Sequence, residues 1–357
     1  FSETNKVLYE SAWKSQFISG VMQPVMMFVG NLGYAGVAIS GAMLAIKNVI
    51  GIGDIQAFIQ YVRTLTQPLS QAAQVMNQVQ SMGAAGERVF EFLAEEEESR
   101  DPEDSVAQDD VQGFVEFEHV QFGYDPEQII INDFSANVKP GQKIAIVGPT
   151  GAGKTTIVKL LMRFYDVNAG AIRIDGVDIR SMSRHGLRNN IAMVLQDTWL
   201  YSDTIMENIR YGNQDATDEE VVAAAKAARA DRFIKTLPAG YDMVLNEDAT
   251  NISEGQKQLL TIARAILADR KLLILDEATS SVDTRTEARI QEAMDNLMKG
   301  RTTFVIAHRL STIRDADLIL VMNHGDIIEQ GTHDELLAQG GAYADLYNSQ
   351  FDEVEAS

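Results

Sequence analysis

The feature that most limits how this chain can fold is a charge-free stretch near its N-terminus. Residues 17–46 contain no Asp, Glu, Lys or Arg. About 20 apolar residues are enough for a helix to cross a bilayer core of ~30 Å, so we predict a membrane span over 17–46. Pro24 is a position at which this helix can kink. The alternative, a buried core helix, is disfavoured by the length and by small residues suited to close helix contacts in lipid. These are Gly30, Gly33, Gly36 and Gly41.

The next stretch, residues 55–93, is helical in pattern but much more polar, because glutamines and Arg63 recur along it. A polar helix in a membrane must face protein or water, so a span over about 55–80 would line an aqueous cavity. The alternative is an extended cytoplasmic helix.

Methionines of the first stretch could add to an adaptable cavity, although such residues more often serve as packing. They are Met22, Met26 and Met27.

Residues 95–110 form an acidic run in which nine of sixteen side chains are Asp or Glu. Such a composition predicts a solvated linker. The net charge of −21 argues against non-specific binding of nucleic acid, which needs a basic face. The absence of cysteine excludes disulfides, thiol catalysis and cysteine-based zinc sites.

From Val111 onward, short apolar strands alternate with helical segments. This alternation predicts an α/β domain over 111–350 with a substantially parallel sheet, followed by a tail at 351–357. Ligands of such domains bind at the carboxyl ends of the strands.

Residues 148–155, GPTGAGKT, match the pattern G-x-x-x-x-G-K-[ST] between an expected strand and a helix that begins near Lys154. Backbone N–H groups of such a loop surround phosphates, Lys154 reaches their oxygens, and the Thr155 hydroxyl can bind Mg²⁺. LLILDE, residues 272–277, predicts a buried strand that delivers two carboxylates to the same site. Asp276 is placed to hold Mg²⁺, and Glu277 to act as general base on an attacking water. Alone, this second motif would fit an ordinary strand and an acidic turn.

Residues 251–256, NISEGQ, precede a predicted helix that starts near Gly255. Ser253 and Gly255 make that helix start suitable for binding an anion, because it offers unpaired N–H groups and partial positive charge. Glu254 places a carboxylate at the same point. His308, which follows an apolar strand directly, can reach a neighbouring phosphate.

In this order, the motifs resemble those of an ABC exporter subunit, in which a membrane domain precedes an ATPase domain. The resemblance covers essentially the whole chain. The matching elements are Tyr124 in the place of the adenine-stacking aromatic, 148–155 as Walker A, Gln196 as the Q-loop residue, 251–256 as the signature loop, 272–277 as Walker B with its glutamate, Asp283 in the D-loop and His308 as the switch histidine. Residues 1–94 resemble the fifth and sixth membrane helices. The chain begins with Phe1, and we expect a fragment that lacks the first four helices.

The resemblance implies an α-helical transmembrane segment, the last two helices of an exporter membrane domain, followed by an α/β P-loop ABC ATPase domain. It implies that ATP and Mg²⁺ are bound between two ATPase domains. The catalytic residues would be Glu277, His308 and Gln196, and the Mg²⁺ ligands Thr155, Gln196 and Asp276. The nucleotide would contact Tyr124, Gly148, Pro149, Thr150, Gly151, Ala152, Gly153, Lys154, Thr155, Thr156, Ser253, Gly255, Gln256 and Asp283. Gln196 would also relay motion to the membrane helices.

Glu254 departs from the family's usual LSGGQ, and Ala249 replaces a glycine expected two residues after Glu247. At ~6 Å from a phosphate charge and an effective dielectric near 20, the carboxylate would cost roughly 3 kcal/mol. This pattern resembles asymmetric heterodimeric exporters, so we expect a second exporter half-subunit of a different sequence as partner. A homodimer is the alternative.

The expected function is ATP-driven export of a hydrophobic or amphipathic substrate, with multidrug efflux first and lipid or peptide export as alternatives. A soluble ABC-type ATPase of DNA maintenance is a competing class, which the charge-free stretch disfavours, and a P-loop kinase would not explain NISEGQ. The implied location is the cell membrane, in contact with lipid, with the ATPase domain in the cytoplasm. Two spans return the chain to the same side, so residues 1–15 would be cytoplasmic and 47–54 outside.

Overall fold

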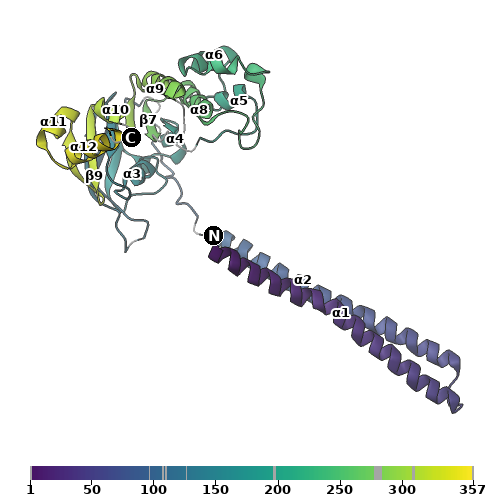
Figure 1. The fold of residues 1–357 in the computed structure, drawn as a ribbon. Coiled ribbons are helices and arrows are strands. Elements are labelled where there is room, and N and C mark those ends of the chain that lie inside the picture. The colour runs from purple at the N-terminus through teal and green to yellow at the C-terminus, as the bar shows by residue number, and fades with distance from the viewer. Residues whose placement is uncertain are drawn as a thin grey trace. The chain divides into compact units, whose positions relative to one another are not determined.

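The computed structural model describes residues 2–95, 97–106, 108, 111–125, 127–195, 198–276, 284–307 and 310–355. The chain divides into two compact units, Phe1–Ser99 and Arg100–Ser357. The first unit is helical and the second contains the sheet (Figure 1).

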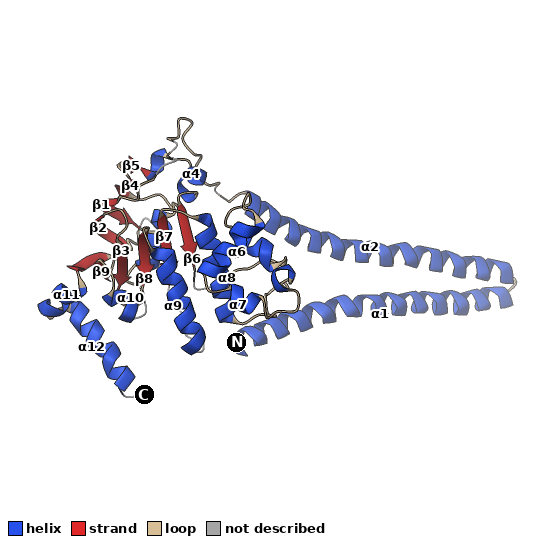
Figure 2. Cartoon of the chain, turned by 90° about the horizontal axis from the view of Figure 1, so that it is seen from above, coloured by secondary structure: helices blue, strands red, loops and turns tan. Residues whose placement is uncertain are grey.

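The first unit consists of two long helices, α1 (Ser2–Ile46) and α2 (Ile52–Leu93), which lie side by side (Figures 1 and 2). Part of α1, Pro24–Ile46, is long and apolar enough to cross a membrane, with a mean hydropathy of 1.5. It is the only such helix among the described residues. The predicted second span lies within α2, which is too polar for hydropathy to identify. Pro24 lies inside α1, and the helix continues through it.

The second unit is built on one sheet whose described strands follow the order β5-β4-β1-β2-β10-β9-β3-β8-β7-β6. The strands are β1 Val115–Phe122, β2 Ile131–Val138, β3 Lys143–Val147, β4 Ala169–Ile174, β5 Val177–Asp178, β6 Ile191–Val194, β7 Leu272–Asp276, β8 Thr302–Ile306, β9 Leu318–Asn323 and β10 Asp326–Gly331. The half from β9 to β6 is parallel, as predicted.

The other half of the sheet is largely antiparallel, which the prediction of a substantially parallel sheet did not include. β1 pairs with β2 and β4 in antiparallel fashion, and β4 with β5. Along β2, buried and exposed side chains largely alternate. An antiparallel strand can leave one face in water and so lacks the continuous apolar run of a parallel strand. This is why the sequence signal of β2 was weak.

Helices cover both faces of the parallel half, because its strands alternate between two cores. In β3, Ile144 and Ile146 point into one core, whereas Ala145 and Val147 point into the other. Helix α3 (Lys154–Leu161) packs in the first core with β1 and β2, and α8 (Glu254–Ala268) packs in the second. Figure 2 shows α8 and α9 beside the parallel strands. The remaining helices are α4 Arg184–Arg188, α5 Ile205–Arg210, α6 Asp218–Ala227, α7 Asp231–Ile234, α9 Thr284–Met298, α10 Leu310–Arg314, α11 His333–Gln339 and α12 Ala342–Glu355, with 3₁₀ turns η1 Ile179–Ser181 and η2 Gly240–Asp242.

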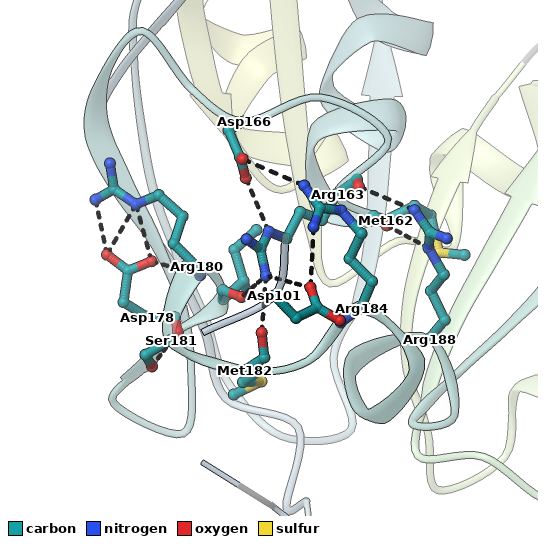
Figure 3. Close-up of polar contacts among 11 residues, drawn as sticks. Asp101, Met162, Arg163, Asp166, Asp178, Arg180, Ser181, Met182, Arg184 and Arg188 are labelled. Carbon is teal, nitrogen blue, oxygen red and sulfur yellow. Dashed lines mark hydrogen bonds and ion pairs between the residues drawn. The ribbon is translucent and has the colours of Figure 1, made fainter. Parts of the chain in front are cut away.

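The predicted acidic linker is exposed over residues 97–106, yet it contacts the ATPase unit through Asp101. The Asp101 carboxylate accepts a hydrogen bond from Nη1 of Arg184 at 2.9 Å and lies 3.7 Å from Nη1 of Arg163 (Figure 3). The backbone N–H of Arg184 also donates to it, at 3.0 Å. Further along, the N–H of Val106 donates to the carbonyl oxygen of Ser181. Composition could not reveal this docking, because the two arginines are distant in sequence.

Arg163 and Arg184, which bind Asp101, make further polar contacts. Arg163 is 4% exposed and donates to the carbonyl oxygens of Ile179 and Met182 at 3.2 and 2.7 Å. Its Nε donates to Asp166 at 2.8 Å, and Arg184 lies 3.5 Å from the same carboxylate (Figure 3). Asp101 and Asp166, each about one third exposed, therefore pair with two nearly buried arginines.

Candidate functional site

The phosphate loop predicted at 148–155 runs from the end of β3 into α3, which begins at Lys154 as expected. Its glycines have the geometry that the pattern requires. A Cβ at Gly148 would lie 2.2 Å from the carbonyl oxygen of Met322, and Gly153, the N-cap of α3, has a φ of 101°. At Gly151, in contrast, a Cβ would meet no heavy atom within 4 Å. The loop therefore packs closely against Met322 of β9 at Gly148, whereas no other described part of the chain obstructs its backbone at Gly151.

Lys154 lies across this loop. Its Nζ donates to the carbonyl oxygens of Gly148 and Pro149 at 2.7 and 3.0 Å. Burial lowers the pKa of Lys154, and the negative charge of Asp276 acts in the opposite direction. Lys154 can therefore bind an anionic ligand, while Asp276 can bind the metal ion that accompanies that ligand.

The strand register explains how Asp276 comes near this loop. Asp276 ends β7 and is paired with Ile306 of β8, which is in turn paired with Ile146 of β3. Because these strands are parallel, their carboxyl ends meet at the same edge of the sheet. The first turn of α3 begins beyond that edge with Thr155 exposed and Thr156 buried.

Four of the predicted site residues lie outside the described residues: Gln196, Glu277, Asp283 and His308. The described residues that directly precede three of them are Leu195, Asp276 and Ala307. These follow or end the neighbouring parallel strands β6, β7 and β8. The roles of the four residues stay predictions.

Tyr124 lies beside the first turn of α3, although it is 32 positions away from Thr156 in the sequence. Its hydroxyl is 3.5 Å from the Thr156 hydroxyl, and Nζ of Lys159 lies 5.3 Å from the centre of its ring. Phe122 and Tyr165 contact the ring edge to face, each at 5.0 Å between centroids. The fold therefore brings the predicted adenine-stacking residue to the phosphate loop, with 45% of its surface exposed.

Helix α8 begins at Glu254, within one residue of the predicted start. Ser253 is its N-cap and accepts from the N–H of Gln256 at 3.4 Å, while the Gln256 side chain accepts from the N–H of Ser253 at 2.9 Å. This capping box satisfies two terminal donors. Gly255 is buried in the first turn. The three predicted ligands thus form one compact helix start.

The Glu254 carboxylate is engaged by neighbouring side chains. It accepts from the Thr198 hydroxyl at 2.8 Å and lies 3.3 Å from Nζ of Lys257. Sequence analysis missed the pairing of Glu254 with Lys257. Their spacing could have predicted it, because a cation three residues after a carboxylate on a helix forms a favourable pair. Thr198 was not predictable, because it belongs to the segment after β6.

Ala249, the second departure, has a φ of 49° and is 1% exposed. That backbone conformation favours glycine. The structure thus explains why a glycine is expected there, and shows a buried methyl group in its place.

Family comparisons agree with this arrangement in both parts of the chain. The ABC transporter family profile matches residues 131–280, and the profile of the ABC transporter transmembrane region matches residues 1–69. The chain belongs to the ABC transporters. Its transmembrane region precedes its ATPase domain, as in ABC exporters. It is therefore a membrane protein whose ATPase domain lies in the cytoplasm.

Similar proteins extend beyond this chain. The fatty acid ABC transporter ATP-binding/permease protein of Mycobacterium bovis is 57% identical over 343 residues, which are 96% of this chain and 54% of the relative. The ATP-dependent lipid A-core flippase of Syntrophus aciditrophicus is 42% identical, covering 99% of this chain and 59% of the flippase. A solved bacterial Atm1-family ABC exporter with ATP bound is 37% identical, with a TM-score of 0.69, covering 98% of this chain and 61% of that one. The chain thus spans between half and two thirds of these relatives.

The ATPase domains of this family use ATP with Mg²⁺, and the residues of this site fit both. The open backbone at Gly151 and the Lys154 amine suit a polyphosphate. The exposed Thr155 and the carboxylate of Asp276 are hard oxygen donors of the type that Mg²⁺ prefers. Tyr124 offers an aromatic face near the same loop.

Proposed function

We propose that the intact protein is an ATP-driven exporter of an amphipathic, lipid-like substrate. One arrangement carries the proposal: Lys154 lies across the phosphate loop, with Nζ on the carbonyl oxygens of Gly148 and Pro149, and the parallel strands bring Asp276 to the same edge of the sheet. The chain also carries an apolar helix, Pro24–Ile46, of membrane-spanning length. A soluble ATPase of DNA maintenance would not need that helix.

In this proposal each site residue has one role. Lys154 binds phosphate oxygens, and Thr155, Asp276 and Gln196 hold the metal ion. Mg²⁺, when bound, offsets the charge of the phosphates. Tyr124 stacks on the base.

Two residues outside the described part of the chain complete the catalytic set. Glu277 accepts the proton of the attacking water, and His308 contacts the terminal phosphate. Asp283 approaches the nucleotide from the D-loop. These roles follow from the resemblance to ABC exporters.

The substrate class rests on the relatives. The Mycobacterium bovis relative, which is 57% identical, is named as a fatty acid transporter, and the relative named as a lipid A-core flippase is 42% identical. We therefore place a fatty acid or similar amphipathic lipid first. Multidrug efflux is the alternative, since the methionines and glutamines of α1 and α2 would also suit drugs.

Transport by the full-length protein in lipid vesicles tests the proposal. With MgATP on the side of the ATPase domain, we expect accumulation of a labelled long-chain fatty acid. Glu277→Gln should lower turnover by at least about a hundredfold, the scale of a lost general base, while ATP binding persists. Transport of a cationic dye without fatty acid would reassign the substrate. Turnover unchanged in the variant would remove Glu277 as general base.

We further propose that the signature loop acts on a nucleotide held by a second exporter subunit. A heterodimer is favoured by the departures at Glu254 and Ala249, although the ion pair of Glu254 with Lys257 weakens the repulsion argument. Purification of the full-length chain alone separates the cases. Substrate-stimulated turnover without another subunit would support a homodimer and defeat the heterodimer.

A further inference from the structure

Glu254, the residue that departs most from the usual signature loop, is joined to a segment 56 positions away. Its Oε1 accepts from the Thr198 hydroxyl at 2.8 Å, and its Oε2 lies 3.3 Å from Nζ of Lys257. Thr198 stands two positions after Gln196 in the sequence. The carboxylate therefore connects the start of α8 to the segment that carries the predicted Q-loop residue.

Lys257 holds the carboxylate in this orientation. The Lys257 side chain is only 16% exposed, and its Nζ also donates to the carbonyl oxygen of Asp248 at 3.2 Å. If Glu254 turned away, a poorly solvated amine would lose its carboxylate, which is unfavourable. The pair also has no net charge, so the repulsion that Glu254 would exert on a phosphate is weakened.

A second contact attaches the same segment further along α8. Nη1 of Arg264 donates to the carbonyl oxygen of Trp199 at 3.2 Å, and its Nε donates to that of Asn208 at 2.9 Å. Arg264 lies roughly 15 Å along the helix from Glu254 at 1.5 Å per residue. Trp199 is 62% exposed, whereas Leu200 beside it is buried in the core and the N–H of Tyr201 donates to the Asn208 side chain at 3.1 Å. On the exposed side of this anchor, two polar contacts attach Thr198 and Trp199 to α8, and Glu254 makes the one next to the signature loop.

We propose that Glu254 is a positioning residue for ATP hydrolysis, which keeps the segment after β6 in fixed register with the signature helix. Movement of either element is then passed to the other. This inference rests on the proposed function, because it assigns a role within the ATPase cycle. It differs from a degenerate signature loop, in which Glu254 would only repel phosphate.

Hydrogen exchange in the nucleotide-free, full-length protein tests the connection itself. Glu254→Gly installs the usual family residue and removes both contacts, whereas Thr198→Val removes only the hydroxyl donor. We expect the amides of residues 198–203 to exchange about fivefold faster in each variant, the factor typical of one lost hydrogen bond, and no faster in the double variant. Glu219→Gln, in the first turn of α6, is the control and should leave exchange in this segment unchanged. Equal exchange in the wild type and both variants would overturn the inference.

Steady-state kinetics of ATP hydrolysis distinguish a positioning role of Glu254 from repulsion of phosphate by its carboxylate. In both variants we expect substrate-stimulated kcat to fall about fivefold, with the KM for ATP changed by less than about twofold. If Glu254 only repelled phosphate, Glu254→Gly would instead tighten ATP binding, by up to about a hundredfold, and this result would overturn the inference. A wild type without turnover would refute the proposed function, while the exchange result would still decide whether the connection exists.

Discussion

Tyr124 is an exposed ring whose orientation is set by its neighbours before any ligand arrives. Phe122 and Tyr165 contact it edge to face, and Lys159 lies over the ring. A ring held in this way loses little further freedom when a base stacks on it, so more of the stacking energy appears as affinity.

We predict that Tyr124→Ala weakens ATP binding by about tenfold, because stacking of a base on an aromatic ring is worth ~1–3 kcal/mol. Tyr124→Phe should bind almost as the wild type does, since the hydroxyl contact with Thr156 is long, at 3.5 Å. Equilibrium binding of ATP and of tripolyphosphate, measured on the full-length protein, checks both points. Tripolyphosphate has no base, so an equal loss for both ligands would contradict the stacking role.

Helices α1 and α2 are brought together by a glycine at their contact. A Cβ at Gly41 would lie 2.9 Å from Cγ1 of Ile55, and one at Gly33 would lie 3.4 Å from Cγ1 of Val62. At Gly36 nothing lies within 4 Å. Among Gly33, Gly36 and Gly41, Gly41 makes the closest approach, of the kind that small residues permit between membrane helices.

Gly41→Leu should therefore push the two helices apart and destabilise the helix pair by about 1–3 kcal/mol, the usual cost of overpacking. Gly36→Leu is the matched control, since it adds the same side chain where this helix pair leaves space. Thermal unfolding of the full-length protein in detergent and in lipid measures the difference. Equal loss for the two variants would show that the contact with Ile55 does not limit stability.

Asp101 makes a contact that attaches the acidic run to the rest of the ATPase unit. Its carboxylate pairs with Arg184 and lies near Arg163, both nearly buried. Hydrogen bonds to charged groups contribute more than neutral ones, and a nearly buried arginine is costly to leave without its carboxylate. The acidic run is thus attached to the ATPase unit at Asp101.

We predict that Asp101→Asn releases this end of the connection. Trypsin should then cleave after Arg100 about tenfold faster in the full-length protein, since local opening limits cleavage and the lost contacts are worth ~1–3 kcal/mol. Asp104→Asn, a change at an exposed residue of the same run, should leave the cleavage rate unchanged. If cleavage were equally fast in the wild type and both variants, Asp101 would not hold the run in solution.

The sequence by itself determined the features that depend on residues close together in the chain. The start of α3 after Gly153, the N-cap at Ser253 and the apolar strand that ends at Asp276 all follow from local pattern, because capping and burial periodicity act within a few residues. The order of the motifs was enough to predict the class of domain.

Only the tertiary structure decided which distant residues meet. Thr198, which donates to Glu254, is 56 positions away from it, and Arg184, which donates to Asp101, is 83 positions away. The antiparallel pairing of β1 with β2 and β4 was likewise not predicted. Such contacts depend on which strands become neighbours, and that follows from packing of the whole core, which no local pattern encodes.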